Sequence, residues 1–384
     1  MTIPIVDLYA QYLTIKQEID RAIAEVIAES AYIRGRHVDA FEQAWASALG
    51  VKRCISCANG TDAIYIALRA LRVKPGDEVI TSAHSSISTS ETITQAGGRV
   101  VFCDTDEETF TVDPDDIQRK ITPAAVGIIP VHLYGQPADM DAIMAIAKRH
   151  NLWVIEDCGQ AHLARYKGRY VGTFGDAASF SFYPAKNLGA YGDAGCVVTN
   201  DDRLAEWMTT FARHGGKGDH IMEGINSRMD GLQAAILNAK LPHLRAWTEA
   251  RRRLAGCYDE LLDDVGDIIT PKVGPGRDHV YHLYVIRTEN RDTLREYLTQ
   301  AGISTVLSYP KALPFYPAYA HLGHVPKDFP VACFNQSRIL SLPIYPEMTK
   351  EMITHTVGYI ASFFKEFQES DSIPAKVIQF AERL

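Results

Sequence analysis

The sequence lacks a long apolar segment, an export signal and a paired set of cysteines. No window of the 384 residues approaches the roughly 18 uninterrupted apolar residues of a membrane span. The amino-terminal segment, residues 1–7, has neither a basic stretch nor a long apolar core, so it does not resemble a secretion signal. The 7 cysteines are odd in number and scattered, which favours reduced thiols. We therefore expect a cytoplasmic protein with no membrane partner.

The chain also lacks an excess of basic residues. Lys and Arg total 39 against 47 Asp and Glu, which gives a net charge of -8. Because neutralisation of phosphates dominates nucleic-acid binding, this balance argues against nucleic acid as the main partner. No stretch of twenty to fifty residues repeats, which excludes a solenoid or a propeller.

The sequence has no convincing set of metal ligands, and we predict no metal site. Cys54 and Cys57 form a CxxC, but no second ligand pair follows, and both lie in an apolar run that is typical of a strand. Two groups of histidines could suggest a metal site. The members of the first group are too far apart in the sequence for an i, i+4 pair of ligands. The second group is a close pair beside aromatic residues, and there structural roles are favoured. The first group is His162, His214 and His220, and the close pair is His279 and His282.

Short β-rich runs alternate with helical patterns between about residues 50 and 200, which indicates an α/β domain on a mostly parallel sheet. The length is more than twice the roughly 150 residues of one domain, so a second, smaller domain is expected. We predict a large α/β domain over residues 1–250, including amino-terminal helices, and a small α+β domain over residues 251–384. The seven expected strands are Cys54–Ala58, Glu78–Ala83, Arg99–Asp104, Val126–His132, Trp153–Cys158, Ser179–Tyr183 and Gly195–Asn200.

Helices are predicted wherever apolar residues recur at spacings of three and four. One of them starts directly after Asn59-Gly60-Thr61, and another includes Met140–Ala147. A single strand-like run, His282–Arg287, is expected in the smaller domain. The remaining predicted helices are Ile15–Glu29, Val38–Leu49, Leu232–Ala246, Glu249–Leu262, Arg291–Ala301 and Lys350–Phe364.

In open α/β sheets, ligands bind outside the carboxyl ends of the strands, and polar residues follow several of the predicted strands there. The segment Asn59-Gly60-Thr61-Asp62 ends one strand and opens a helix. Glycine lets the backbone approach an anion, and the free amides of the first helical turn point at it, so the segment is a candidate phosphate site. A helix entry with Thr61 or Asp62 as N-cap explains the same residues equally well.

Asp157 follows the fifth predicted strand, where a carboxylate can hold a cationic ring nitrogen. Gln160 lies three residues further on and can face the same pocket. A capping aspartate is an equal alternative when Asp157 is considered alone.

Lys186 follows an aromatic strand and Pro184, and precedes Gly189, Gly192 and Gly195. Most lysines are solvated surface charges, but this one is tethered in a tightly turned loop at the ligand edge of the sheet. A shielded amine can lose its proton and act as a nucleophile or a general base, as a Schiff-base lysine must.

Together, the anion site, the aspartate and the lysine match the three contributions that pyridoxal phosphate (PLP) needs from a protein. The combination is far more specific than any one part. A Rossmann dehydrogenase is disfavoured, because no GxGxxG follows the first strands.

Nearly the whole chain resembles the DegT/DnrJ/EryC1/StrS family of PLP-dependent nucleotide-sugar aminotransferases. The lysine segment and the Asn-Ser-Arg segment are the most specific parts of the match. The resemblance implies fold type I, as in aspartate aminotransferase, with helices on both faces of a seven-stranded sheet. The segments that carry it are Ile33–Gly35, Ala58–Ala63, Pro130–Gly135, Glu156–His162, Ser179–Gly195, Gly224–Asp230, Leu232–Ala235 and Leu340–Pro346.

The resemblance also implies roles for individual residues. Lys186 would bind PLP covalently and move the proton, Asp157 would keep the ring nitrogen protonated, and Gln160 would bond the phenolic oxygen. The family works as homodimers with the site at the interface. The phosphate would be held by Gly60, Thr61 and Ser181, with Asn226 reaching in from a second subunit, and the substrate would be contacted by Arg34, His162, Tyr183 and Tyr309.

The chain departs from the family at two places. Ser86 stands where an aromatic side chain usually covers the cofactor ring, so His84 or another side chain would cover it, or the stacking is looser. Ser308-Tyr309-Pro310 replaces the usual His-Tyr-Pro on the sugar side.

The segment Asn187–Asp193 is similar to that of enzymes that aminate carbon three of nucleotide-linked sugars. The resemblance thus implies transfer from glutamate, which yields 2-oxoglutarate, to a keto group at C-3 of a nucleotide-linked deoxy sugar. Amination at C-4 or of a 3-keto uronate stays open, as does a non-catalytic PLP-binding regulatory protein. A dehydratase of the same fold is disfavoured, since it would carry histidine in place of Lys186.

Overall fold

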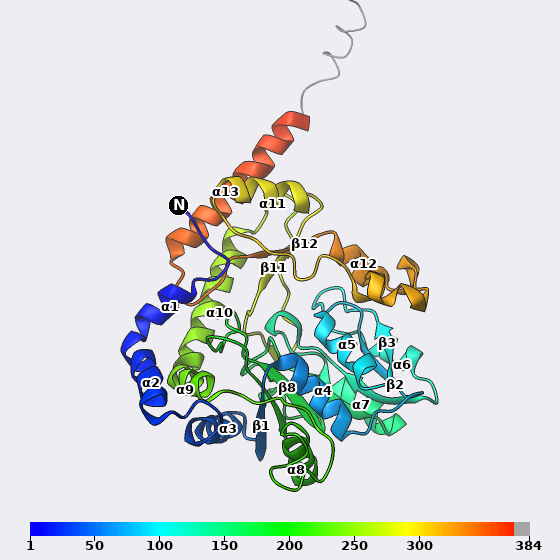
Figure 1. Ribbon diagram of the computed structural model, residues 1–384. Coiled ribbons are helices and arrows are strands. Elements are labelled where there is room, and N and C mark those ends of the chain that lie inside the picture. The colour runs from blue at the N-terminus through cyan, green and yellow to red at the C-terminus, as the bar shows by residue number, and fades with distance from the viewer. Residues whose placement is uncertain (372–384) are drawn as a thin grey trace, which may run out of the picture.

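The computed structural model describes residues 1–371, and its central element is a seven-stranded sheet of order β1-β9-β8-β5-β4-β2-β3 (Figure 1). Neighbouring strands are parallel except β9, which runs antiparallel to both β8 and β1. All seven predicted strands are present, and the α/β class with a mostly parallel sheet is confirmed. The strands are β1 (Arg53–Cys57), β2 (Glu78–Ser82), β3 (Arg99–Cys103), β4 (Ala125–Ile129), β5 (Trp153–Asp157), β8 (Ala177–Ser181) and β9 (Gly195–Thr199).

Helices cover both faces of the sheet, because successive strand side chains point to opposite faces and most of them are apolar. On β9, Val197 packs into one hydrophobic cluster, whereas its neighbours Cys196 and Val198 pack into another. The first cluster contains α4 (Gly60–Ala70), α5 (Ile87–Gln95) and α8 (Asp202–Phe211). The opposite face is covered by α3 (Arg36–Leu49), α6 (Pro114–Lys120), α7 (Met140–His150) and α9 (Gly231–Lys240).

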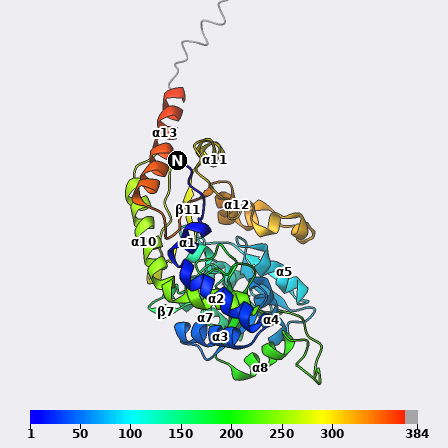
Figure 2. The same cartoon turned by 60° about the vertical axis from the view of Figure 1, so that its left-hand side comes forward.

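The amino-terminal helices α1 (Leu8–Thr14) and α2 (Lys16–Glu29) lie beside α9 and α10 (Leu244–Leu261) along one flank (Figures 1 and 2). Ile15 and Ile19 are buried against Ile236 and Trp247 in a small apolar cluster. The predicted helices at Ile15–Glu29 and Val38–Leu49 are thus confirmed, with a separate short helix before the first.

The carboxy-terminal part has its own apolar cluster, built by β11 (Tyr284–Arg287), α11 (Arg291–Gln300), β12 (Ile339–Leu342) and α13 (Lys350–Asp371) with α10. Ile3 belongs to this cluster and is fully buried there. Its amide donates to the Gly302 carbonyl at 2.9 Å, and its carbonyl accepts from the Ser304 amide at 2.9 Å. The division at residue 250 stays a prediction. It falls inside α10, and residues 372–384 of the predicted small domain lie outside the described part.

Several short elements were not predicted. β12 pairs antiparallel with β11, and three two-residue strands, β6 (Arg165–Tyr166), β7 (Arg169–Tyr170) and β10 (Arg277–Asp278), form a small sheet. The break predicted between residues 246 and 249 lies instead at Leu241–His243, a single 3-10 turn in which Pro242 supplies no amide donor. The other short elements are α12 (Pro330–Gln336) and the 3-10 turns Leu133–Gly135, Leu313–Phe315, Pro317–Leu322 and Pro326–Asp328.

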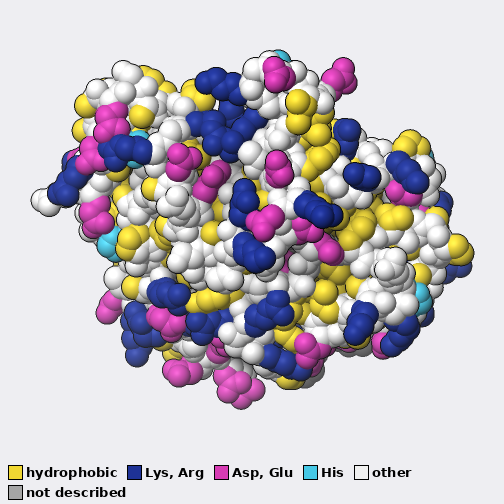
Figure 3. All heavy atoms as spheres, turned by 90° about the horizontal axis from the view of Figure 1, so that it is seen from below, with side chains coloured by type: hydrophobic (Ala, Val, Ile, Leu, Met, Phe, Trp, Pro, Cys, Tyr) yellow, Lys and Arg dark blue, Asp and Glu magenta, His cyan; other side chains and the backbone are white. Residues whose placement is uncertain are grey.

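Acidic and basic side chains lie interspersed over most of the face seen from below (Figure 3). Within residues 1–371, no helix combines the length and the apolar character that crossing a membrane requires.

Candidate active site

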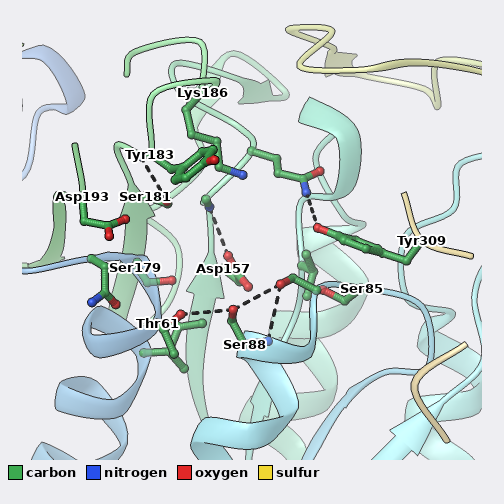
Figure 4. Close-up of a pocket in the computed structure, with 17 residues that line it drawn as sticks. Thr61, Ser85, Ser88, Asp157, Ser179, Ser181, Tyr183, Lys186, Asp193 and Tyr309 are labelled. Carbon is green, nitrogen blue, oxygen red and sulfur yellow. Dashed lines mark hydrogen bonds between the residues drawn. The ribbon is translucent and has the colours of Figure 1, made fainter. Parts of the chain in front are cut away.

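A cavity of about 310 Å³ opens at the carboxyl ends of the parallel strands (Figure 4). It brings together nine of the twelve predicted site residues, from segments that are up to 249 positions apart (residues 60 and 309). The nine are Gly60, Thr61, Ser86, Asp157, Gln160, Ser181, Tyr183, Lys186 and Tyr309. The other lining residues are Asn59, Ile64, Ser85, Ser88, Val131, Gly159, Ser179 and Asp193.

The amino terminus of α4 forms one wall of the cavity. Asn59 is the N-cap, and its Oδ1 accepts from the Asp62 amide at 2.8 Å, so the expected cap at Thr61 or Asp62 was wrong. The Thr61 hydroxyl donates to the Ser88 hydroxyl at 3.1 Å. The first amides of a helix have no intrahelical acceptor, which makes this end a suitable place for a phosphate.

Gly60 lies against the end of β8. A methyl group at residue 60 would be 2.6 Å from Cβ and 3.1 Å from Cα of Ser181, which is closer than carbon atoms approach. Only glycine therefore lets the start of α4 sit directly against Ser181, so that both segments face the same anion site.

We expect Gly60→Ala to separate these two segments. Overpacking at such a contact typically costs about 1–3 kcal/mol, and PLP affinity should fall at least about tenfold because the phosphate wall shifts. Thermal unfolding and PLP titration measure the two effects. Gly256→Ala is the matched control: this helical glycine has nothing within 4 Å of an added methyl group, so that variant should gain about 0.5–1 kcal/mol. Unchanged PLP affinity in Gly60→Ala would contradict the assignment.

Asp157 lies at the end of β5 with both carboxylate oxygens held. Oδ2 accepts from the Thr89 hydroxyl at 2.7 Å, and Oδ1 accepts from the Gly159 amide at 3.1 Å. Each oxygen has a second lone pair left, so a positively charged N–H in the cavity can still be bound. The carboxylate is fixed in direction before any ligand arrives.

Lys186 projects its amine into the cavity beside Tyr183, on the side opposite Thr61 and Ser88 (Figure 4). Burial lowers the pKa of the Lys186 amine to about 8, although the nearby charge of Asp157 acts in the opposite direction. At pH 7 roughly a tenth of such amines are neutral, compared with fewer than about one in a thousand for an ordinary lysine. The residue is therefore suited to act as a nucleophile and as a proton carrier.

Gln160 links the large sheet to the carboxy-terminal part. Its Oε1 accepts from the Tyr134 amide at 2.7 Å, and its Nε2 donates to the Tyr309 hydroxyl at 3.0 Å. These bonds fix which end of the amide faces the cavity. Nε2 keeps a second hydrogen for a ligand oxygen, as the predicted role requires.

His84 does not line the cavity. It is buried, and its Nε2 accepts from the Tyr309 amide at 3.2 Å and lies 3.1 Å from the Tyr134 hydroxyl. Burial lowers the pKa of His84 to about 4, so the ring is neutral at pH 7. Of the three predicted alternatives, cover by His84 is disfavoured by its position outside the cavity wall, while cover by another side chain and looser stacking stay predictions. Ser86 does line the cavity, where it also caps α5.

Three predicted site residues lie outside the cavity. His162 is fully buried, with its ring 5.8 Å from that of Trp45 and 5.5 Å from that of Phe182, so its assignment as a substrate contact is corrected to core packing. Arg34 lies 3.9 Å from the Asp39 carboxylate, and Asn226 is exposed and pairs with the backbone of Arg213. Asn226 was assigned to a second subunit, so a single chain leaves that role a prediction.

Sequence reasoning missed the residues that orient the site. Thr89 holds Asp157, and Ser85 and Ser88 add hydroxyls to the cavity wall. The signal available was the hydroxyl-rich run Ser85-Ser86-Ile87-Ser88-Thr89-Ser90, which begins three residues after β2 ends at the ligand edge.

A buried group of potential metal ligands, His132, Glu156 and Cys158, includes the two chain neighbours of Asp157. The Glu156 carboxylate accepts from the amides of Gly172, Phe174 and Gly175 at 2.7, 2.7 and 2.9 Å and contacts His132 Nε2 at 3.1 Å. The other His132 nitrogen accepts from the Ala138 amide at 2.9 Å. These hydrogen bonds already occupy the ligand atoms of the carboxylate and the imidazole, which explains the group as a structural network.

Relatives of the chain are similar over almost their full length. A Geobacillus stearothermophilus protein described as a pleiotropic regulatory protein is 47% identical over 96% of this chain and 100% of its own. A UDP-N-acetyl-3-dehydro-alpha-D-glucosamine 3-aminotransferase of Acidithiobacillus ferrooxidans is 42% identical over 93% of this chain and 97% of its own.

Solved structures show the same architecture. DesV of Streptomyces venezuelae, determined in complex with a ketimine intermediate, superposes with a TM-score of 0.92 at 38% identity and covers 94% of this chain and 98% of its own. NtdA of Bacillus subtilis, determined with bound cofactor PMP, superposes with a TM-score of 0.85 at 31% identity. The match covers 94% of this chain and 85% of NtdA. The family model of these aminotransferases matches residues 13–361. The chain belongs to the DegT/DnrJ/EryC1/StrS aminotransferase family.

Proposed function

We propose that the protein uses PLP to transfer an amino group from glutamate to a keto group at C-3 of a nucleotide-linked deoxy sugar. The observation that carries this proposal is one cavity that contains the amine of Lys186, the fixed carboxylate of Asp157 and the anion site at the start of α4. NtdA, which has the same fold, was determined with PMP bound.

The residues present fit the cofactor. The phosphate would lie between Gly60, Thr61 and Ser181, and the ring nitrogen would face Asp157, whose second lone pairs are available. When bound, PLP supplies an electron sink for the carbanion that forms when the donor loses its Cα proton.

The chain itself orients the reactants and carries the proton. Lys186 accepts the proton from the donor and delivers it at the next step, which its partly neutral amine allows. Asp157 keeps the opposing ring nitrogen protonated and thereby stabilises the charge that develops. Tyr183 and Tyr309 line the same cavity, and Tyr183 is also exposed to solvent, so a sugar would contact these two rings.

The C-3 position is supported by the names of several related proteins, which refer to different sugars. Their names include transaminases for dTDP-3-amino-3,4,6-trideoxy-glucose and dTDP-3-amino-3,6-dideoxy-galactose and an aminotransferase for a UDP-linked 3-oxo-glucuronate. The last name keeps a 3-keto uronate as an alternative substrate, and C-4 amination is the other. A homodimer that shares its sites, with Asn226 of the second subunit at the phosphate, is part of the proposal, as is a cytoplasmic location.

A regulatory function is the second candidate, because two relatives at 47% and 43% identity are described as a pleiotropic regulatory protein and a sensory transduction protein. The complete site, with a shielded lysine, favours catalysis. A protein that only senses PLP has no need of a proton carrier.

A substrate screen tests the proposal. Purified protein with PLP is incubated with glutamate and one nucleotide-linked sugar at a time: a 3-keto sugar, a 4-keto sugar or a 3-keto uronate. Mass spectrometry should show amination of the 3-keto deoxy sugar together with an equal amount of 2-oxoglutarate. Amination of the 4-keto sugar alone would contradict the C-3 assignment, and amination of the 3-keto uronate alone would contradict the deoxy sugar as substrate. If no amino acid changes the absorption of the bound PLP, the regulatory function is favoured.

A further inference from the structure

Lys240, the last residue of α9, is a buried charge outside the cavity. Only 1% of its surface is exposed, although lysine is almost never fully buried without a partner. Its ammonium donates to the Gly189 carbonyl at 2.6 Å and lies 5.1 Å from the centre of the Tyr191 ring and 5.9 Å from that of Trp247. Two of these three contacts of Lys240, those with Gly189 and Tyr191, are with the loop that carries Lys186.

That loop turns back on itself directly after Lys186. The Lys186 amide donates to the Tyr183 carbonyl and the Ala190 amide to the Phe182 carbonyl, both at 2.8 Å. At Gly189 a methyl group would be 2.1 Å from the Pro184 carbonyl oxygen, so the two arms of the turn touch. The Gly189 carbonyl points away from this contact to Lys240. The hydrogen bond from Lys240 to this carbonyl therefore helps to set the position of the returning arm of the turn, and with it the position of the Lys186 backbone.

Helix α9 supports the loop at a second point. Gln233, two turns before Lys240, accepts from the Tyr191 amide through Oε1 at 2.8 Å. The loop is thus hydrogen-bonded to α9 on both sides of Ala190. This connection matters because α9 packs firmly on α3 and α2 and is a rigid support for a short irregular segment.

The charge of Lys240 is retained in this position. Burial lowers the pKa of Lys240 to about 8, and the charge of Glu347 partly offsets that effect. At neutral pH the group is mainly protonated and can donate. Hydrogen bonds from charged donors are roughly twice as strong as neutral ones, so this contact holds the carbonyl more firmly than a methyl-terminated side chain of the same length could.

We propose that Lys240 is a positioning residue, whose ammonium fixes the Gly189 turn and thereby holds Lys186 at the distance from which its amine reacts. The inference rests on the proposed role of Lys186 and adds a second lysine that acts through the backbone. Displacement of a reacting group by about 1 Å can reduce a rate a hundredfold, so a hydrogen bond behind the loop has a measurable effect on the site.

Reductive labelling tests the inference without turnover. The cofactor-free protein is exposed briefly to PLP at a limiting concentration, reduced with borohydride and mapped by mass spectrometry, which gives the rate of labelling at Lys186. In Lys240→Met that rate should fall roughly ten- to a hundredfold while the protein still unfolds cooperatively. A wild-type labelling rate in the folded variant would overturn the inference, because Lys240 would then serve packing alone.

Lys120→Met is the matched control. Lys120 also donates to a backbone carbonyl, that of Phe102 at 2.8 Å, and lies 4.1 Å from the Phe329 ring centre, but does not touch the lysine loop. This variant should label at the wild-type rate at temperatures well below its melting midpoint, and an equal decrease in both variants would overturn the inference.

Gln233→Leu covers the case in which Lys240→Met does not fold. It removes the other support and should slow labelling in the same direction; a wild-type rate there would contradict the role of α9. If the wild-type protein itself carries no label at Lys186, the proposed function fails first, and this outcome differs from a failure confined to the variants.

Discussion

Replacing Lys186 with alanine should reduce glutamate-driven transamination about 10,000-fold. One amine supplies both the covalent attachment of PLP and the proton transfer, and a positioned acid–base group alone contributes roughly 100- to 10,000-fold. PLP should still bind, since the phosphate wall at Gly60 and the carboxylate of Asp157 remain. The measurement is single-turnover conversion of glutamate to 2-oxoglutarate, with absorption spectra recorded to show that PLP is bound.

Lys167→Ala is the control for the loss of a lysine. Lys167 is exposed and pairs with the Asp141 carboxylate at 2.5 Å, so its removal should leave the rate unchanged. The pH dependence provides a further check. Because the neutral amine reacts, labelling of Lys186 in the cofactor-free protein should rise with pH and level off above about pH 8, where its pKa lies. A rate that keeps rising to pH 10 would mean an unshielded amine.

Replacing Asp157 with asparagine should slow the proton transfer roughly 100- to 1,000-fold, the usual cost of removing one preorganised electrostatic group. The asparagine oxygen can still accept from the Gly159 amide, and its Nδ2 can donate to the Thr89 hydroxyl, which then acts as the acceptor. The side chain is therefore held in place, but it carries no charge to keep the ring nitrogen protonated. PLP affinity should change much less. Exchange of the glutamate Cα proton measures the first effect, and PLP titration measures the second.

Thr89→Val provides a graded comparison. It removes the donor at 2.7 Å from Oδ2 and leaves the carboxylate charged, so the rate should fall by a smaller factor than in Asp157→Asn. Equal losses of PLP affinity and of proton-transfer rate in Asp157→Asn would show that Asp157 holds the cofactor without tuning it.

The sequence was sufficient to predict those residues whose position follows from the end of a strand. Asp157 ends β5, Lys186 follows β8 and Gly60 follows β1. Once the strands are recognised, the parallel arrangement of β5 and β8 brings their polar successors to one edge. These strands can be recognised as short, largely apolar runs, because both faces of the sheet are covered.

Residues that depend on contacts between distant segments were not predictable in the same way. A histidine side chain can bind a substrate, so the sequence suggests this role for His162. In the fold, however, its ring packs against Trp45 and Phe182. The contact of His84 with the Tyr309 amide joins segments 225 residues apart. Two-residue strands such as β6 and β10 carry no periodicity, and their pairing is decided by the packing of the folded chain.

The placement of Ile3 has a consequence for how the protein is made. Its backbone is bonded to residues 302 and 304, which leave the ribosome long after it does. During synthesis Ile3 therefore cannot form these bonds until residue 304 has left the ribosome, when about four-fifths of the 384 residues have emerged. Closing so long a loop is entropically costly and slow, so attachment of Ile3 would be one of the final events in maturation.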